Sequence, residues 1–192
     1  MKDKGIIITG GPGTGKTAAI LQLVENSCFG SRRRENYGRE FDHLADSVVG
    51  YHFCQVEDSI TCSLANMIHS IAAQLVQVPS LHAYGLLLST DEELRSKLSL
   101  SRCLEDPDAA LVDAILLPLS KLDMEGKIDK DNRIILIDAL CASQIHQTDY
   151  GDTIISFLAK HLEHFPSFMK LVLTIRTEKV HLTESLPFRS IR

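Results

Sequence analysis

The hydrophobic positions of the chain alternate between short aliphatic runs and longer stretches in which apolar residues recur every three or four positions. The short runs are rich in isoleucine, leucine and valine, which is typical of strands buried on both faces of a parallel sheet. These predicted strands lie at residues 6–9, 45–54, 133–138 and 171–175. The helical spacing between them indicates amphipathic helices. Strands that alternate with helices predict an α/β fold with a doubly wound parallel sheet.

Four main helices are predicted from this spacing, at residues 16 to 26 or 28, 60–75, 111–122 and 154–162. The third is expected to begin near Asp106, because this capping carboxylate precedes a proline at the first helical position. Pro118 should kink or break that helix near its end. Asp152 or Thr153 is the expected cap of the fourth helix. Residues 80–104 are expected to form short helices.

Residues 10–17 lie between the first strand and the first helix, read GGPGTGKT, and match the Walker A pattern G-x-x-x-x-G-K-[ST]. Glycine lets backbone N–H groups approach phosphate oxygens closely, and the helix that follows adds its positive N-terminal dipole. Lys16 is expected to contact the β- and γ-phosphates of a nucleotide, and the Thr17 hydroxyl to bind Mg²⁺. The alternative, a glycine-rich turn with a chance lysine, is disfavoured by this strand-to-helix position. The predicted phosphate-binding residues are Gly10, Gly11, Pro12, Gly13, Thr14, Gly15, Lys16 and Thr17.

Two further candidates follow predicted strands. Residues 133–138, RIILID, have the Walker B pattern, in which a buried strand delivers a carboxylate, here Asp138, to the metal. Arg176 leaves the strand at residues 171–175 at the same edge of the sheet, because the carboxyl ends of parallel strands meet there. We expect Arg176 either to contact the γ-phosphate or to be an ordinary surface arginine at a strand end.

Length, charge and composition argue against several classes of protein. The length of 192 residues suggests one domain, residues 1–192. The net charge of −5 argues against a nucleic-acid-binding protein, which usually carries a basic face. No apolar run approaches the length of a membrane span, so an integral membrane protein is not expected. Five cysteines without a C-x-x-C pair fit the reduced thiols of a cytoplasmic protein.

Several blocks of the chain together resemble the TANC family of scaffold proteins, which includes insect rolling pebbles. The blocks are GIIITGGPGTGKT at 5–17, YHFC at 51–54, RIILID at 133–138, DYGDTIISFL at 149–158 and LVLTIRT at 171–177. The resemblance implies a NACHT-like module of the STAND class of P-loop ATPases, with ATP or ADP and Mg²⁺ as its ligands. It further implies the strand order 5-1-4-3-2, with the fifth strand missing or incomplete. Direct pairing of the strands at 6–9 and 134–138 would instead favour the kinase and GTPase branch.

The resemblance also carries expectations about context. In the TANC family the module precedes ankyrin and tetratricopeptide repeats within larger cytoplasmic scaffolds, at postsynaptic sites or in myoblast fusion. It therefore implies that this chain is a fragment of a larger scaffold, with protein partners and a cytoplasmic, postsynaptic or cell-cortex location. Self-association is left open.

The residues after Asp138 depart from the STAND pattern, in which further acids follow the Walker B aspartate. The matching positions are Cys141 and Ala142, and neither side chain deprotonates water. We therefore expect a nucleotide-dependent switch or scaffold module that binds ATP with weak or absent hydrolysis. An active ATPase that uses Asp149 or Glu178 as its base is one alternative, and a small-molecule kinase is another. No N-K-x-D motif of a GTPase occurs late in the chain.

Overall fold

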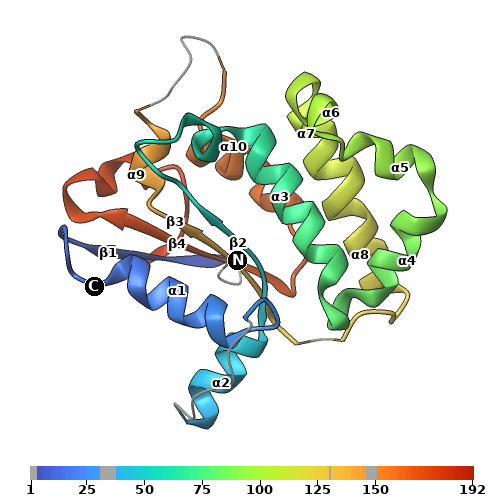
Figure 1. Ribbon diagram of the computed structural model, residues 1–192, viewed down its shortest axis with the longest axis horizontal. Coiled ribbons are helices and arrows are strands. Elements are labelled where there is room, and N and C mark those ends of the chain that lie inside the picture. The colour runs from blue at the N-terminus through green and yellow to red at the C-terminus, as the bar shows by residue number, and fades with distance from the viewer. Residues whose placement is uncertain (1–3, 31–37, 130, 146–150) are drawn as a thin grey trace.

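The computed structural model describes residues 4–30, 38–129, 131–145 and 151–192. Within these ranges, five parallel strands form one sheet in the order β2-β3-β4-β1-β5. The strands are β1 (Gly5–Gly10), β2 (Val48–Phe53), β3 (Arg133–Asp138), β4 (Met169–Arg176) and β5 (Arg189–Ile191). Helices flank the sheet on both faces (Figure 1), so the predicted α/β, doubly wound, P-loop-like fold is confirmed.

One face of the sheet is covered by α1 (Lys16–Asn26), and α2 (Arg39–Asp46) packs beside it (Figure 1). Ile20 and Val24 of α1 are buried. They share an apolar cluster with the sheet residues Val48, Ile134, Leu136 and Val172. The first helix therefore begins at the residue predicted for it, and of its apolar residues Ile20 and Val24 are buried whereas Leu21 is 45% exposed.

The opposite face is covered by α3 (Leu64–Gln77) and α10 (Ile154–His161), and shorter helices pack against α3 (Figure 1). A larger apolar cluster joins these helices to the inward side chains of the strands. The remaining helices are α4 (His82–Thr90), α5 (Glu92–Lys97), α6 (Leu100–Glu105), α7 (Pro107–Leu111), η3 (Val112–Leu116), α8 (Leu117–Met124) and α9 (Leu140–Ser143), with the 3-10 turns η1 (Ser59–Cys62), η2 (Pro79–Leu81), η4 (Leu162–His164) and η5 (Thr177–Thr183). The short helices expected at 80–104 are confirmed.

The position of β4 distinguishes between the predicted topologies. β4 pairs with β1 on one side and with β3 on the other, with Ile8 opposite Thr174 and Leu136 opposite Val172. The predicted order 5-1-4-3-2 is therefore confirmed, and β1 and β3 do not pair directly. β5 pairs with β1 over three residues, which agrees with the expected incomplete fifth strand.

Two predicted boundaries were wrong. The strand expected from residue 45 begins at Val48, because Ala45 still belongs to α2, a helix that was not predicted. The helix expected from residue 60 begins at Leu64, because the Asp58 carboxylate caps a separate 3-10 turn by accepting from the Ile60 N–H at 3.0 Å. Ile60 is consequently 63% exposed instead of contributing to the core.

Pro118 was expected to kink or break its helix near the end; the helix is not broken there and continues to Met124. A π-helical turn, η3, precedes the proline, which then lies in the first turn of α8. A proline has no N–H to donate to the carbonyl four residues earlier, which belongs to Ala114. The buried Tyr84 hydroxyl donates to that oxygen at 2.8 Å. A side chain from α4 thus supplies the donor that the proline lacks.

Gln74 of α3 covers the outer edge of β2. Its Oε1 accepts a hydrogen bond from the Tyr51 backbone N–H at 2.8 Å, and its Nε2 donates to the Tyr51 carbonyl at 3.0 Å. β2 is the outermost strand on this side of the sheet. Polar contacts to the backbone therefore hold α3 against β2 in addition to apolar packing.

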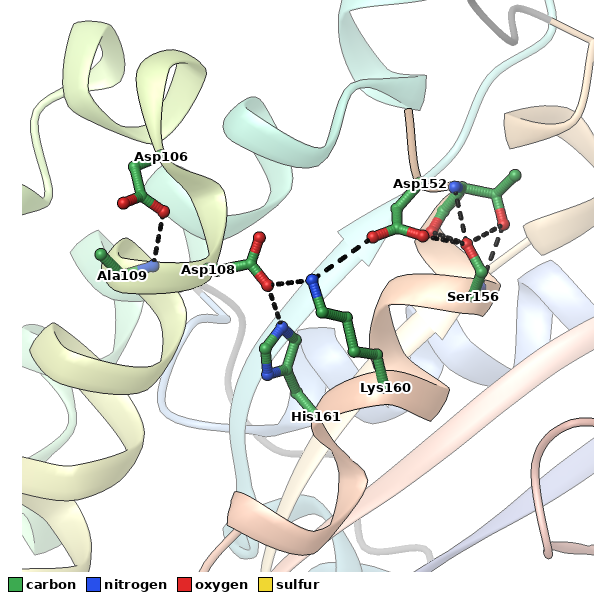
Figure 2. Close-up of polar contacts among 8 residues, drawn as sticks. Asp106, Asp108, Ala109, Asp152, Ser156, Lys160 and His161 are labelled. Atoms are coloured by element: carbon green, nitrogen blue, oxygen red, sulfur yellow. Dashed lines mark hydrogen bonds and ion pairs between the residues drawn. The ribbon is translucent and has the colours of Figure 1, made fainter. Parts of the chain in front are cut away.

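The outer helices contact α10 through an ionic cluster centred on Asp108 of α7 (Figure 2). Asp108 Oδ1 lies 2.7 Å from the Nε2 atom of the buried His161 and also contacts the Lys160 ammonium. Lys160 extends the cluster to Asp152, 3.8 Å away. The hydrogen bond from Lys160, aided by that from His161, lowers the pKa of the Asp108 carboxyl below its usual value.

None of the described helices is by itself long and apolar enough to cross a membrane; the residue ranges Leu64–Gln77 and Pro79–Thr90 meet the length and composition criteria only when combined, and they meet at an angle of 92°.

Candidate functional site

The loop between β1 and α1 has the backbone that its glycines predict. Gly13 and Gly15 have φ angles of 73° and 86°, in the left-handed region that residues with a Cβ rarely adopt. Gly15 is also the N-cap of α1, and this helix has no side-chain cap. The first N–H groups of α1 are therefore left for another acceptor, which is the arrangement that binds anions at helix N-termini.

Lys16 lies over the same loop. Its ammonium donates to the carbonyl oxygens of Gly10 at 2.8 Å and Gly11 at 2.7 Å, and it lies 3.3 Å from the Thr14 hydroxyl. The sequence alone gives Lys16 no obvious structural partner, and these contacts correct that expectation. They place a positive charge at the entrance of the loop.

Asp138 ends β3 with a carboxylate that is 2% exposed. The Thr17 hydroxyl donates to its Oδ2 at 2.6 Å, and the Thr174 hydroxyl of β4 donates to its Oδ1 at 2.5 Å. Thr174 also accepts from the N–H of Ala139, whose φ of 56° turns the chain away from the strand. Two hydroxyls from two different elements therefore fix the orientation of this carboxylate.

The Thr17–Asp138 pair fits a magnesium ion. Mg²⁺ prefers oxygen ligands and usually takes one or two from the protein, with water and phosphate oxygens completing the shell. A hydroxyl and a carboxylate 2.6 Å apart supply such a set. The described residues contain no cluster of three or more histidine, cysteine or acidic side chains that would hold a metal without other ligands.

A cavity of about 580 Å³ opens at the carboxyl ends of the strands. The four predicted site residues outside residues 10–15 all line it, namely Lys16, Thr17, Asp138 and Arg176. Arg176 is exposed at the end of β4, opposite Gly10 in the strand register. Pro12 and Gly13 also line the cavity, whereas Gly10, Gly11, Thr14 and Gly15 belong to the loop behind it.

Not all of the residues considered for catalysis lie at the cavity. Cys141 is half-buried and Ala142 is buried, and both line the cavity, so no carboxylate stands where the family pattern has one. Glu178 is exposed in η5 and does not line the cavity. Asp149 lies outside the described residues. Burial raises the pKa of the Cys54 thiol, which also lines the cavity, to about 12.

Two residues at the cavity were missed from the sequence, Thr174 and Glu57. Thr174 was detectable as a polar residue within the otherwise aliphatic β4, next to the predicted Walker B strand. Glu57 follows β2. Site residues in parallel sheets follow the carboxyl ends of the strands, and this rule, which indicated Asp138 and Arg176, also applies to Glu57.

The strand order, the loop after β1 and the carboxylate at the end of β3 define the molecule as an α/β protein of the P-loop-like class. The family model described as Nephrocystin 3, N-terminal, matches residues 2–176. The chain therefore belongs to this family, a NACHT- or STAND-like N-terminal region. The matched range includes β1 to β4 and ends before β5. No solved structure matches the chain.

Proposed function

We propose that this chain is an ATP-binding P-loop module that acts as a nucleotide-dependent switch or scaffold element with weak or absent hydrolysis. The observation that carries the proposal is the convergence of Lys16, Thr17 and Asp138 on one cavity at the carboxyl ends of the strands. Loop amides, a lysine, a metal-binding hydroxyl and a strand-end aspartate are the parts with which P-loop proteins bind nucleoside triphosphates.

Each residue has a distinct part in the proposed binding. The loop amides and Lys16 bind the phosphates, and for this the Lys16 ammonium exchanges the carbonyls of Gly10 and Gly11 for phosphate oxygens. Thr17 and Asp138 hold Mg²⁺, which when bound neutralises charge on the β- and γ-phosphates. Arg176 lines the same cavity and contacts the γ-phosphate in this proposal.

Weak hydrolysis follows from the residues after β3. Phosphoryl transfer to water needs a group that orients the attacking water in addition to the phosphate clamp and the metal. The positions that carry it in STAND ATPases hold a thiol and a methyl group here, at Cys141 and Ala142. Loss of such a group costs roughly 10²–10⁴ in rate, while binding rests on other residues.

The proposal also includes a more specific assignment within this family. The TANC-like blocks in the sequence support a STAND module within a cytoplasmic scaffold, at a postsynaptic or cortical site, whose nucleotide occupancy controls protein partners. The acidic net charge speaks against nucleic acid as a partner. The kinase alternative is disfavoured because β4 separates β1 from β3.

The test is the thermal stability of the protein, titrated with ATP, ADP and GTP in the presence of Mg²⁺. A ligand at a hundredfold excess over its Kd stabilises the folded state by about 2.7 kcal/mol, or roughly 5–11 °C for a domain of this size. The Lys16→Ala variant should fold and lose this shift, because Lys16 is half-exposed and its hydrogen bonds among the described residues go to Gly10, Gly11 and Thr14. Lys179→Ala removes an exposed lysine outside the cavity and is the matched control. Equal shifts in wild type and Lys16→Ala would contradict the proposal.

A further inference from the structure

The cavity at the strand ends contains one carboxylate that the proposed nucleotide binding does not use. Among the described residues that line this cavity, the acids are Asp138 and Glu57. Both oxygens of Asp138 already accept hydrogen bonds from threonine hydroxyls, and its side chain is buried. The Glu57 side chain is exposed, and within the described ranges its carboxylate has no hydrogen-bond or ion-pair partner.

The backbone holds Glu57 in a tight turn at residues 55–58. The Asp58 N–H donates to the Gln55 carbonyl at 3.2 Å, and the two residues form an antiparallel bridge. The Thr61 hydroxyl supports both ends of the turn, since it accepts from the Gln55 N–H at 2.8 Å and donates to the Asp58 carbonyl at 2.7 Å. The turn is therefore fixed by its neighbours, while the Glu57 carboxylate itself is available.

The turn also lies beside the end of the Walker B strand. Phe53 is opposite Asp138 in the parallel register of β2 and β3. The Cys54 N–H continues this pairing by donating to the Asp138 carbonyl at 3.1 Å. The next residues along the chain, including Glu57, line the cavity shared with Lys16. A carboxylate in this position lines the same cavity as the metal-binding pair.

We infer that Glu57 orients and deprotonates the attacking water in the weak hydrolysis of a bound nucleoside triphosphate, a role that the side chains of Cys141 and Ala142 do not fill. The inference rests on the proposed nucleotide binding. In the reaction, the water oxygen bonds to the γ-phosphorus and the bond from that phosphorus to the β–γ bridging oxygen breaks. The bridging oxygen keeps the electron pair as part of the nucleoside diphosphate. The Glu57 carboxylate accepts the proton of the water and passes it to solvent, to which the side chain is exposed.

Glu57→Gln tests this role, because it keeps the size of the side chain and removes the base. Glu178→Gln is the matched control, since Glu178 is exposed and lies outside the cavity. Three quantities are measured with Mg·ATP: the Kd, the single-turnover rate of γ-phosphate release, and the identity of the nucleotide retained after gel filtration. For Glu57→Gln we expect an unchanged Kd, a rate lower by roughly 10²–10⁴-fold, and ATP retained where the wild type retains ADP. Glu178→Gln should behave as the wild type.

The outcomes separate this inference from the proposed function. A Glu57→Gln rate equal to that of the wild type, at equal affinity, overturns the role of Glu57. A wild-type protein that binds Mg·ATP and leaves it intact also overturns it, and the proposed binding function then stands. A wild-type protein that binds no nucleotide overturns both.

Discussion

Replacing Thr174 by valine tests whether the Asp138 carboxylate depends on its hydroxyl neighbours. Valine keeps the branched shape of threonine and exchanges the hydroxyl for a methyl group. Thr174 is fully buried, and its hydroxyl makes two hydrogen bonds, one to Asp138 Oδ1 and one from the Ala139 N–H. The substitution therefore removes a donor from a buried carboxylate and an acceptor from a backbone amide.

The magnitude follows from these two contacts. A hydrogen bond to a charged group contributes about 1.5–3 kcal/mol, and a buried amide without a partner costs about 1–3 kcal/mol. We expect Thr174→Val to lower the free energy of unfolding by about 3 kcal/mol, or roughly 6–12 °C in Tm at this chain length. Thr9→Val is the matched control, because Thr9 is a buried threonine of β1 with one neutral hydrogen bond, to the Ile191 carbonyl at 3.1 Å. It should cost about 1 kcal/mol.

Urea unfolding followed by circular dichroism measures both variants against the wild type. The Mg·ATP-induced rise in Tm, if the proposed binding holds, should also be smaller in Thr174→Val, because the metal-binding carboxylate has lost part of its support. Equal destabilisation by Thr174→Val and Thr9→Val would refute the reasoning, since it would mean that the Asp138 contact contributes nothing beyond an ordinary hydrogen bond.

Three further predictions concern the Tyr84 hydroxyl, the Asp108 carboxylate and the thiols of Cys28 and Cys54. Tyr84→Phe should lower the free energy of unfolding by about 1–3 kcal/mol in urea, because it leaves a buried carbonyl without its donor. Asp108→Asn should cost less than about 1 kcal/mol at pH 7, since the carboxylate is 42% exposed. The contact with Lys160 lowers the pKa of Asp108, so this stability is present above the ordinary carboxyl pKa and is lost as the pH falls through the lowered value. The stability gap between wild type and Asp108→Asn should therefore close at acidic pH. In the native protein at pH 8, a thiol reagent should modify the exposed Cys28 quickly and Cys54 only slowly, because burial keeps Cys54 protonated.

Each of these predictions has a result that would contradict it. The control for Tyr84→Phe is Tyr51→Phe, because the Tyr51 hydroxyl has no hydrogen-bond partner in the described ranges; equal stability of the two variants would be the contrary result. For Asp108→Asn, a stability gap that widens toward acidic pH would reverse the expected sign. For the thiols, mass spectrometry that finds Cys54 labelled as fast as Cys28 would show that the burial of Cys54 does not protect it.

The sequence predicted the elements whose signal is local. The bounds of β3 and the first residue of α1 agree with the prediction, because an aliphatic run and a Walker A loop are each contained within a few residues. α2 was not predicted, although Phe41, Leu44 and Ala45 recur in it at helical spacing. It is a short surface helix in which four of eight residues are charged and Ala45 is the one residue that is buried.

The parts of the site that the sequence did not reveal depend on distant contacts. Thr174 meets Asp138 although it is 36 positions away from it along the chain. The continuation of the helix through Pro118 similarly depends on a tyrosine hydroxyl thirty positions away from the carbonyl that it reaches. Glu57 was missed because its place at the cavity is set by the turn after β2, whose shape depends on Thr61.

The contact of Gln74 with β2 limits how the sheet can be extended. An outermost strand normally presents unpaired N–H and C=O groups that recruit strands from other molecules. In β2 both groups of Tyr51 are already bonded to the Gln74 amide, which takes the place of a neighbouring strand at the middle of this edge. A foreign strand would have to displace that side chain and move α3 to pair there. At Tyr51 the outer edge of β2 is therefore protected against the addition of a strand from another segment or another protein.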